Sequence, residues 1–405
     1  MATKFDYSVR DRAGKLISGS LDAESPAVVA HKLAAMGYAP VSIKASNTGM
    51  KRELTIPGLG KRVKLTDLAI FSRQFATMIS SGLSLLRALS ILCEQTDNKE
   101  LTRVLVLVRN DIESGDALSS AMSKHPKVFP PLMMNMTRAG EVGGFLDETM
   151  LQIADNYEVE VRLRGKIKSA MTYPVVVFIM AILGCTGMLI FIVPVFAKLF
   201  DSLGGTLPLP TRILVILSGI LRVWAPVFIV AIVVGLVVWR RFKRDIRVRQ
   251  VVDPLRLKLP VFGDLIRKIA LARFARNLGT MMRSGVPILQ SLDIVAATTG
   301  NIVLERATRA VQDSVRSGES LAGPLRDHSV FPPMVVQMMA VGEETGALDT
   351  MLGKIAEFYD QQVEATTESL TALIEPLMIA VLGSMIGGMI IALYMPIFKI
   401  FDLIK

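Results

Sequence analysis

Three long apolar segments stand out in the hydrophobic and polar pattern of the chain. Residues 175–197 and 377–398 contain no charged residue, and residues 213–239 contain only Arg222. A helix needs about 20 apolar residues to cross the roughly 30 Å hydrocarbon core of a bilayer, so each segment is long enough to span a membrane. We therefore predict transmembrane helices at residues 173–198, 213–239 and 375–399.

Amphipathic helical patterns precede the first and the last of these segments. In residues 65–172, apolar residues recur at the three- and four-residue spacing of a helix face, as in Leu68, Phe71 and Phe75. Glycines and prolines divide this region into six helices, which are enough to close a bundle around its own core. Residues 265–374 show the same pattern, so we predict a second six-helix bundle there.

The two predicted bundles are copies of one unit. The stretch GEVGGFLD at residues 140–147 returns as GEETGALD at residues 342–349, a step of 202 residues. Further upstream, residues 71–78 match residues 274–281 at a step of 203. Solenoid repeats are roughly 20–50 residues long, so this period indicates a duplicated domain.

A smaller pattern precedes the first bundle. Phe5, Tyr7 and Val9 alternate with other residues as in a β-strand, and Ser25 can cap a helix that Gly37 ends. We predict a small α/β module at residues 1–45 and a linker without periodicity at residues 46–64. The predicted fold class is an all-α membrane protein with two homologous six-helix bundles, three transmembrane helices and a small N-terminal α/β module.

The charge distribution predicts the orientation in the membrane. The net charge is +10, and the mean hydropathy of +0.46 is high for a soluble protein. Basic residues crowd residues 240–249, directly after the second span, and cytoplasmic loops carry such an excess. We therefore expect the N-terminus and both bundles in the cytoplasm. Residues 199–212 would form an external loop, residues 240–264 a basic cytoplasmic connector and residues 400–405 an external tail.

The sequence offers little for nucleic-acid binding or for catalysis. The basic clusters at residues 162–168 and 240–244 flank the spans, and no groups of aromatic residues interleave with them as base-stacking platforms. The two cysteines and three histidines have no spacing that suits a disulfide framework, a metal site or a catalytic group. A phosphate-binding loop and a dinucleotide fingerprint are both missing. We therefore predict no nucleic-acid partner, no cofactor and no enzymatic activity.

Two further classes of protein stay open on the sequence. A small-solute transporter would need a polar binding site near the middle of the bilayer, and three spans with the off-centre Arg222 offer little for one. A membrane-anchored enzyme would need a convergent polar pocket in one of the bundles. The positive features instead describe two cytoplasmic helical domains on a small membrane anchor, which is the layout of an interaction scaffold.

A set of short motifs is spread over most of the chain. It comprises Phe5-x-Tyr7, the paired openings Phe71-x-Arg73-Gln74 and Phe274-x-Arg276, both Gly-Glu turns, Tyr173-Pro174, residues 257–263 and Pro396-Ile397-Phe398. With this set the chain resembles the integral inner-membrane platform proteins of type IV pilus and type II secretion machines, the PilC/GspF family. The sequence RQFATM at residues 73–78 is more similar to the pilus branch of the family than to the secretion branch.

The resemblance implies a platform protein that couples a hexameric cytoplasmic assembly ATPase to the insertion of pilin subunits into a fibre. The alternative within the family is the equivalent platform of a type II secretion system. The implied partners are the ATPase, pilin or pseudopilin transmembrane helices, other inner-membrane machine subunits, membrane lipid and further copies of the chain. The implied location is the plasma (inner) membrane, crossed several times, and the implied protein is not an enzyme.

The repeated turns supply the first candidate site residues. They are Gly140, Glu141 and Gly144 in the first copy and Gly342, Glu343 and Gly346 in the second. We expect the first glycine of each set to end a helix and the second to turn the chain into the next helix. The glutamate would then lie just before that next helix, close to its free N–H groups and positive dipole end. Alternatively, the glutamates dock a basic surface of the ATPase or of a neighbouring subunit.

The last span supplies the second candidate set. Gly383 and Gly387 are four residues apart, and Ser384 and Gly388 repeat this spacing one position later. Small residues at this interval let two helices approach closely. We predict a packing seam with another span of this chain, a second copy or a pilin helix. The alternative is that glycine is simply common in membrane helices.

Overall fold

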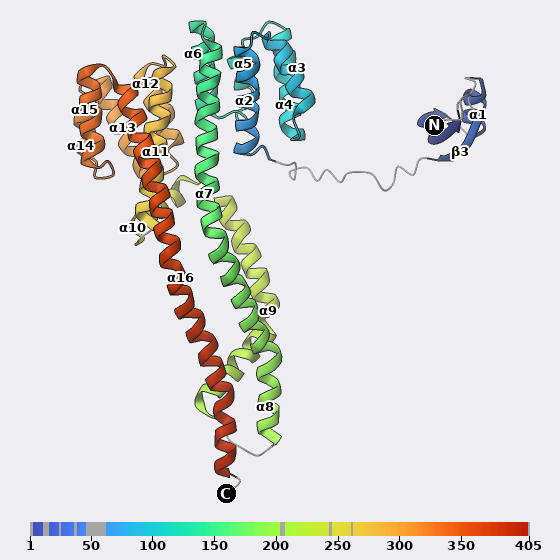
Figure 1. Ribbon diagram of the computed structural model, residues 1–405, viewed down its shortest axis with the longest axis vertical. Helices are drawn as coiled ribbons and strands as arrows, with labels where there is room; N and C mark the ends of the chain where they lie inside the picture. Colours follow the sequence, from blue (N-terminus) through green and yellow to red (C-terminus); the bar gives the residue numbers. More distant parts are fainter. Residues whose placement is uncertain are drawn as a thin grey trace. The chain divides into compact units, whose positions relative to one another are not determined.

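The computed structural model describes residues 3–10, 16–23, 26–35, 39–45, 62–202, 207–242, 245–260 and 262–403 (Figure 1). The chain divides into two units, Met1–Arg62 and Val63–Lys405. Most of the predicted linker, residues 46–61, lies outside the described residues. So do residues 203–206 of the predicted external loop and residues 404–405 of the predicted tail.

The first unit contains an antiparallel sheet of three strands and one helix. Its elements are β1 (Thr3–Arg10), β2 (Leu16–Ala23), α1 (Pro26–Ala35) and β3 (Ala39–Ala45), and the strand order is β2-β1-β3. The pairing of β1 with β3 shifts in register between Ser8 and Val9. Val29 and Leu33 of α1 are buried, so one face of this helix is covered within the unit.

The first repeat of the second unit has six helices. They are α2 (Leu65–Ser80), α3 (Leu85–Gln95), α4 (Lys99–Glu113), α5 (Leu118–Ser123), α6 (Pro131–Gly143) and α7 (Leu146–Gly187). Local signals fix several helix starts. The Asn98 side chain accepts the N–H groups of Glu100 and Leu101 and so caps α4. Pro131 opens α6, at a position where a missing N–H group is not needed.

The second repeat has the same six helices in the same order. They are α11 (Phe262–Arg283), α12 (Ile288–Thr298), α13 (Ile302–Arg316), α14 (Ala322–Arg326), α15 (Pro333–Thr345) and α16 (Leu348–Leu403), preceded by α10 (Ile246–Lys258). Phe71 and Phe129 lie 6.0 Å apart between ring centroids, and their counterparts Phe274 and Phe331 lie 5.1 Å apart. The duplication seen in the sequence therefore extends to equivalent aromatic pairs in the core.

The helix that closes each repeat continues without a break into a membrane span. α7 and α16 run side by side in the same direction, and α9 (Leu209–Phe242) contributes the span between them (Figure 1). Three helices of the described chain are long and apolar enough to cross a membrane, which confirms the predicted number of spans. The expected boundaries between bundle and span, at residues 172 and 374, are not helix ends. α7 and α16 run through these positions and contain Pro174 and Pro376 in their interiors.

Polar side chains of α9 bond to the backbone of the neighbouring spans. α7 passes into one π-helical turn, η1 (Met188–Ile192), and then into α8 (Val193–Ser202). Ser218 Oγ donates to the Leu189 carbonyl in this turn, and Thr211 Oγ1 donates to the Ala392 carbonyl of α16. Such bonds satisfy both hydroxyl and carbonyl where no bulk water is present. They attach α9 to both of the spans that end the repeats.

Candidate functional site

The glutamates of the repeated turns each bind the start of a short helix. The Glu141 carboxylate accepts the N–H of Leu118 at 2.5 Å and that of Ser119 at 3.0 Å. In the second repeat, Glu343 accepts the N–H of Leu321 at 2.7 Å and that of Ala322 at 3.2 Å. Glu141 therefore joins α6 to the start of α5, and Glu343 joins α15 to the start of α14. The first N–H groups of a helix lack partners within that helix, so the carboxylates satisfy them.

The expected position of these glutamates is wrong. They were expected just before α7 and α16, but Glu141 lies inside α6 and Glu343 inside α15. The helices continue three residues past the first glycine and end at the second one. Gly144 has φ +76° and Gly346 has φ +69°, the left-handed conformation that favours glycine at a helix end. The expected turning position of the second glycine is thus confirmed.

The first glycine of each set permits a close approach between helices instead of ending one. A Cβ at Gly140 would lie 2.6 Å from Thr149 Oγ1 and 3.1 Å from the Cα of Leu146. A Cβ at Gly342 would lie 3.0 Å from the Cα of Leu348. In both repeats the glycine therefore makes room for the first turn of the following long helix.

The small residues of the last span do not pack within the described part of the chain. Apart from its chain neighbours and the backbone of its own helix, a Cβ added at Gly383, Gly387 or Gly388 would meet no described atom within 4 Å. Ser384 Oγ donates to the Ala380 carbonyl of its own helix. The α16 side chains that pack on α7 and η1 are Met389 and Leu393, on another face. A seam with another span of this chain is therefore not what the structure describes, and a seam with a second copy or a pilin helix stays a prediction.

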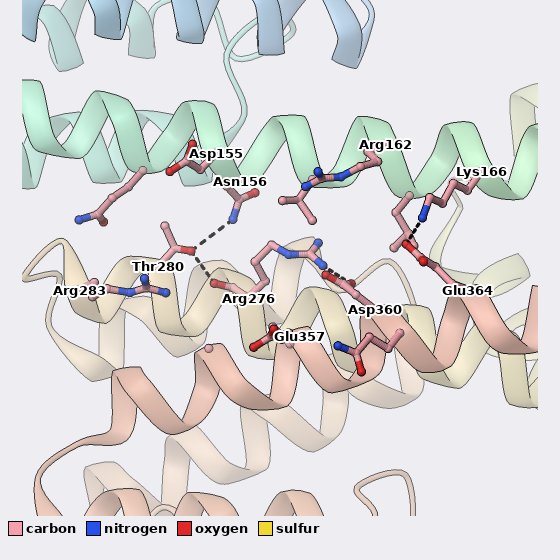
Figure 2. A pocket seen from close by; sticks show the side chains of 16 residues that line it. Asp155, Asn156, Arg162, Lys166, Arg276, Thr280, Arg283, Glu357, Asp360 and Glu364 are labelled. Carbon is pink, nitrogen blue, oxygen red and sulfur yellow. Dashed lines mark hydrogen bonds and ion pairs between the residues drawn. The ribbon is translucent and has the colours of Figure 1, made fainter.

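A polar cavity of about 460 Å³ lies where the two repeats meet, between α7, α11 and α16 (Figure 2). The carboxylate of Glu364 on α16 accepts from Lys166 on α7 at 2.5 Å. Asn156 Nδ2 donates to Asn277 Oδ1 at 3.2 Å. The described lining contains neither histidine nor cysteine, and these two contacts link the repeats to each other.

One ion pair of this region occurs in both repeats. Arg73 Nε lies 2.6 Å from Glu158 Oε1, and the equivalent residues Arg276 and Asp360 form the same pair in the second repeat. A side-chain hydrogen bond from Arg73 holds the pKa of Glu158 below its ordinary value and raises that of Arg73. Each pair joins the first helix of its repeat to the last, α2 to α7 and α11 to α16.

A further ion pair joins the two repeats to each other, as the pair of Lys166 and Glu364 does. Glu160 Oε1 of α7 lies 3.1 Å from Arg273 Nη2 of α11, and both side chains are largely buried. Burial opposes the ionisation of Glu160, but the charges of Arg273 and Arg164 outweigh it and lower the pKa of Glu160. Burial also lowers the pKa of Arg273. The pair is therefore a largely buried charged contact between the repeats, and each partner depends on the other.

The sequence reasoning missed the residues of this interface. Asn156, Glu160 and Arg273 lie on helices for which only the apolar face was predicted, and the sequence pattern assigned these polar side chains no role. The internal repeat contained one signal for polar contacts between these helices. An arginine and an acid occur at equivalent positions of both copies, Arg73 with Glu158 and Arg276 with Asp360. Among the residues that the structure describes, no group of histidine, cysteine and acidic side chains is arranged to hold a metal ion.

Comparison with known proteins adds independent findings. Residues 71–194 and 274–396 match the family described as type II secretion system (T2SS), protein F, and residues 1–44 match the N-terminal domain of that protein. The type IV pilus assembly protein PilC of Thermus thermophilus is 45% identical over 397 residues, covering 98% of each chain. PilC of Myxococcus xanthus is 42% identical over 398 residues, covering 98% of this chain and 95% of that protein. The type II secretion system protein F of Xanthomonas campestris is 33% identical over 401 residues, covering 98% of each.

Proposed function

Because this chain belongs to the type II secretion system protein F family, we propose that it is the inner-membrane platform protein of a type IV pilus assembly machine. The observation that carries the proposal is the difference in similarity between the two branches. Four relatives named PilC are 45%, 42%, 39% and 34% identical to the chain, and the type IV pilus assembly protein TapC is 34% identical. Three relatives named type II secretion system protein F are 33%, 31% and 32% identical.

In this function the protein passes mechanical work from a hexameric cytoplasmic ATPase to pilin transmembrane helices and catalyses no reaction itself. The continuity of α7 and α16 supports this, because each is one helix from its bundle into its span. A displacement of either bundle therefore moves the attached span. The ion pairs between Glu160 and Arg273 and between Lys166 and Glu364 join the two bundles, so that they move together.

The location that goes with this function is the plasma membrane, with the N-terminus and both bundles in the cytoplasm and the C-terminus outside. The exposed apolar side chains of the spans support it, because lipid is the medium that suits them. The parallel course of α7 and α16 also supports it, because two helices that cross in the same direction place their bundles on the same side.

Co-purification from native membranes tests the proposal. The full chain, tagged at its C-terminus, is expected to capture a Walker-type ATPase and a pilin, and deletion of its gene is expected to abolish surface fibres. Capture of a pseudopilin, with secretion lost and fibres intact, would establish the secretion platform instead. A strain that expresses an unrelated tagged membrane protein of three spans provides the control for non-specific capture.

A further inference from the structure

The last helix of the first repeat occupies a groove on the second repeat. Leu163 of α7 is buried in a cluster with Val363 and Leu370 of α16, and Ile269 of α11 packs against the same cluster. Two ion pairs flank this cluster, Glu160 with Arg273 at 3.1 Å and Lys166 with Glu364 at 2.5 Å. The groove between α11 and α16 thus receives one face of α7.

The equivalent groove of the first repeat lies between α2 and α7 and is open. Thr66, Ala69, Ile70, Gln74, Val161 and Arg162 line a depression of about 340 Å³ there. By the internal repeat, Ile70 stands where the second repeat has Arg273, and Arg162 stands where it has Glu364. Ile70 is 54% exposed, and no described helix of the chain covers the depression as α7 covers its counterpart. One half of a duplicated contact is therefore without its partner helix in this chain.

The duplication also identifies the helix that fits the open groove. The residues of α16 equivalent to Glu160, Leu163 and Lys166 of α7 are Gln362, Ala365 and Glu368. Every copy of the chain therefore carries a helix, α16, that could enter the groove of another copy. Phe358 of α16, at the position equivalent to Asn156, is 41% exposed. The contact within the chain is heterologous, since α7 of one repeat meets α11 and α16 of the other, and a heterologous contact can be repeated between subunits.

The acid and the base of the Lys166–Glu364 ion pair exchange places in the equivalent contact. Lys166 and Glu364 form an ion pair within the chain, and their counterparts in a repeated contact are Glu368 and Arg162, again one acid and one base. Glu160 and Arg273 become Gln362 and Ile70, so that no charge is left buried without a partner. Lys168 stands in the first repeat where the second repeat has Leu370. It adds positive charge at the end of the groove that Glu368 would face. Glu368 forms no ion pair with another described residue.

We propose that the groove between α2 and α7 binds the α16 helix of a second copy of this chain, by the same contact that joins the two repeats. Ile70 then packs beside Gln362, Gln74 beside Phe358, and Arg162 pairs with Glu368. α7 and α16 run in the same direction, so repetition of the contact keeps the two copies in one membrane (Figure 1). Head-to-tail contacts of this kind build rings where the rotation closes.

Photo-cross-linking of the full-length chain in native membranes tests the proposal. Benzoylphenylalanine in place of Ile70 is expected to give a product of twice the mass of the chain, with the cross-linked peptide in α16 near Gln362. Leu107, which is 38% exposed on α4, carries the same probe as the matched control and is expected to give no such product. A product with a different protein, or a doubled chain linked outside α16, overturns the proposal.

Charge exchange supplies a second measurement. Glu368→Arg is expected to lower the yield of the doubled product about tenfold, the effect of roughly 1.4 kcal/mol in binding. Arg162→Glu is expected to do the same, and the two substitutions together are expected to restore the yield. Arg162→Glu also places an acid near Glu158, so Glu368→Arg is the single variant that decides: an unchanged yield contradicts the proposal. The readout is self-association, so a negative result leaves the proposed pilus function standing.

Discussion

The carboxylates of Glu141 and Glu343 each accept two backbone N–H groups, and this determines what substitutions do there. Glu141→Gln keeps one acceptor oxygen and places an amide N–H₂ against the other N–H, so we expect a loss of about 1 kcal/mol in stability. Glu141→Leu removes both acceptors, with an expected loss of about 2 kcal/mol. Hydrogen exchange of the full chain, followed in the peptide that contains α5, measures the effect locally.

The neighbouring Glu344 provides the control for this measurement. It is exposed and lies one position after Glu343, so Glu344→Gln is expected to leave exchange unchanged, whereas Glu343→Gln is expected to accelerate exchange in α14. If Glu141→Gln leaves α5 protected but abolishes ATPase capture, the carboxylate is a docking group and the structural explanation is wrong.

At the scale of helices, the sequence predicted the elements but not how the two repeats meet. The six helices of each repeat and the three spans follow from apolar spacing and length, which are local properties. The end of α6 was placed too early, because Gly140 looks like a terminator and the helix beyond it is short of apolar contacts, with Val142 86% exposed. The pairing of Glu160 with Arg273 depends on which face of α7 meets α11, and local periodicity contains no information on that.

The contact between α7 and α11 is expected to depend on pH. The pKa of Glu160 is lower in the folded protein than its ordinary value near 4.3, so the ionised form stabilises the fold. This stabilisation is present above the ordinary value and is lost as pH falls through the lower folded pKa. Glu160→Gln at neutral pH is expected to cost about 3 kcal/mol, because Arg273 is left largely buried without its carboxylate.

The residues equivalent to Glu160 and Arg273 in the internal repeat suggest a second substitution that compensates for Glu160→Gln. Gln362 and Ile70 stand where Glu160 and Arg273 stand, so Glu160→Gln combined with Arg273→Ile is expected to recover most of the lost stability. The melting temperature of the purified full chain, measured between pH 7 and pH 3.5, checks both statements. The difference in melting temperature between wild type and Glu160→Gln should shrink as the pH falls, and a constant difference would show that Glu160 does not titrate in this range.

At the scale of the whole molecule, duplication explains why a third span is needed. Each repeat ends in a helix that enters the membrane in the same direction, so a chain of two repeats alone would place the second bundle on the opposite side. α9 returns the chain between them and is bonded to both partners through Ser218 and Thr211. The basic residues from Arg240 in the last turn of α9 to Arg249 in α10 favour the cytoplasm for this end of the span.

Cysteine labelling tests this arrangement in cells. With Cys93 and Cys185 replaced by serine, Lys405→Cys is expected to react with a membrane-impermeant maleimide in spheroplasts, because an odd number of spans places the C-terminus outside. Arg306→Cys, exposed on α13 of the second bundle, is expected to react only after the membrane is opened. Labelling of both positions only after opening would require an even number of spans. Labelling of Arg306→Cys alone in closed spheroplasts would invert the orientation, and with it the assignment of the bundles to the side on which an ATPase has access to ATP.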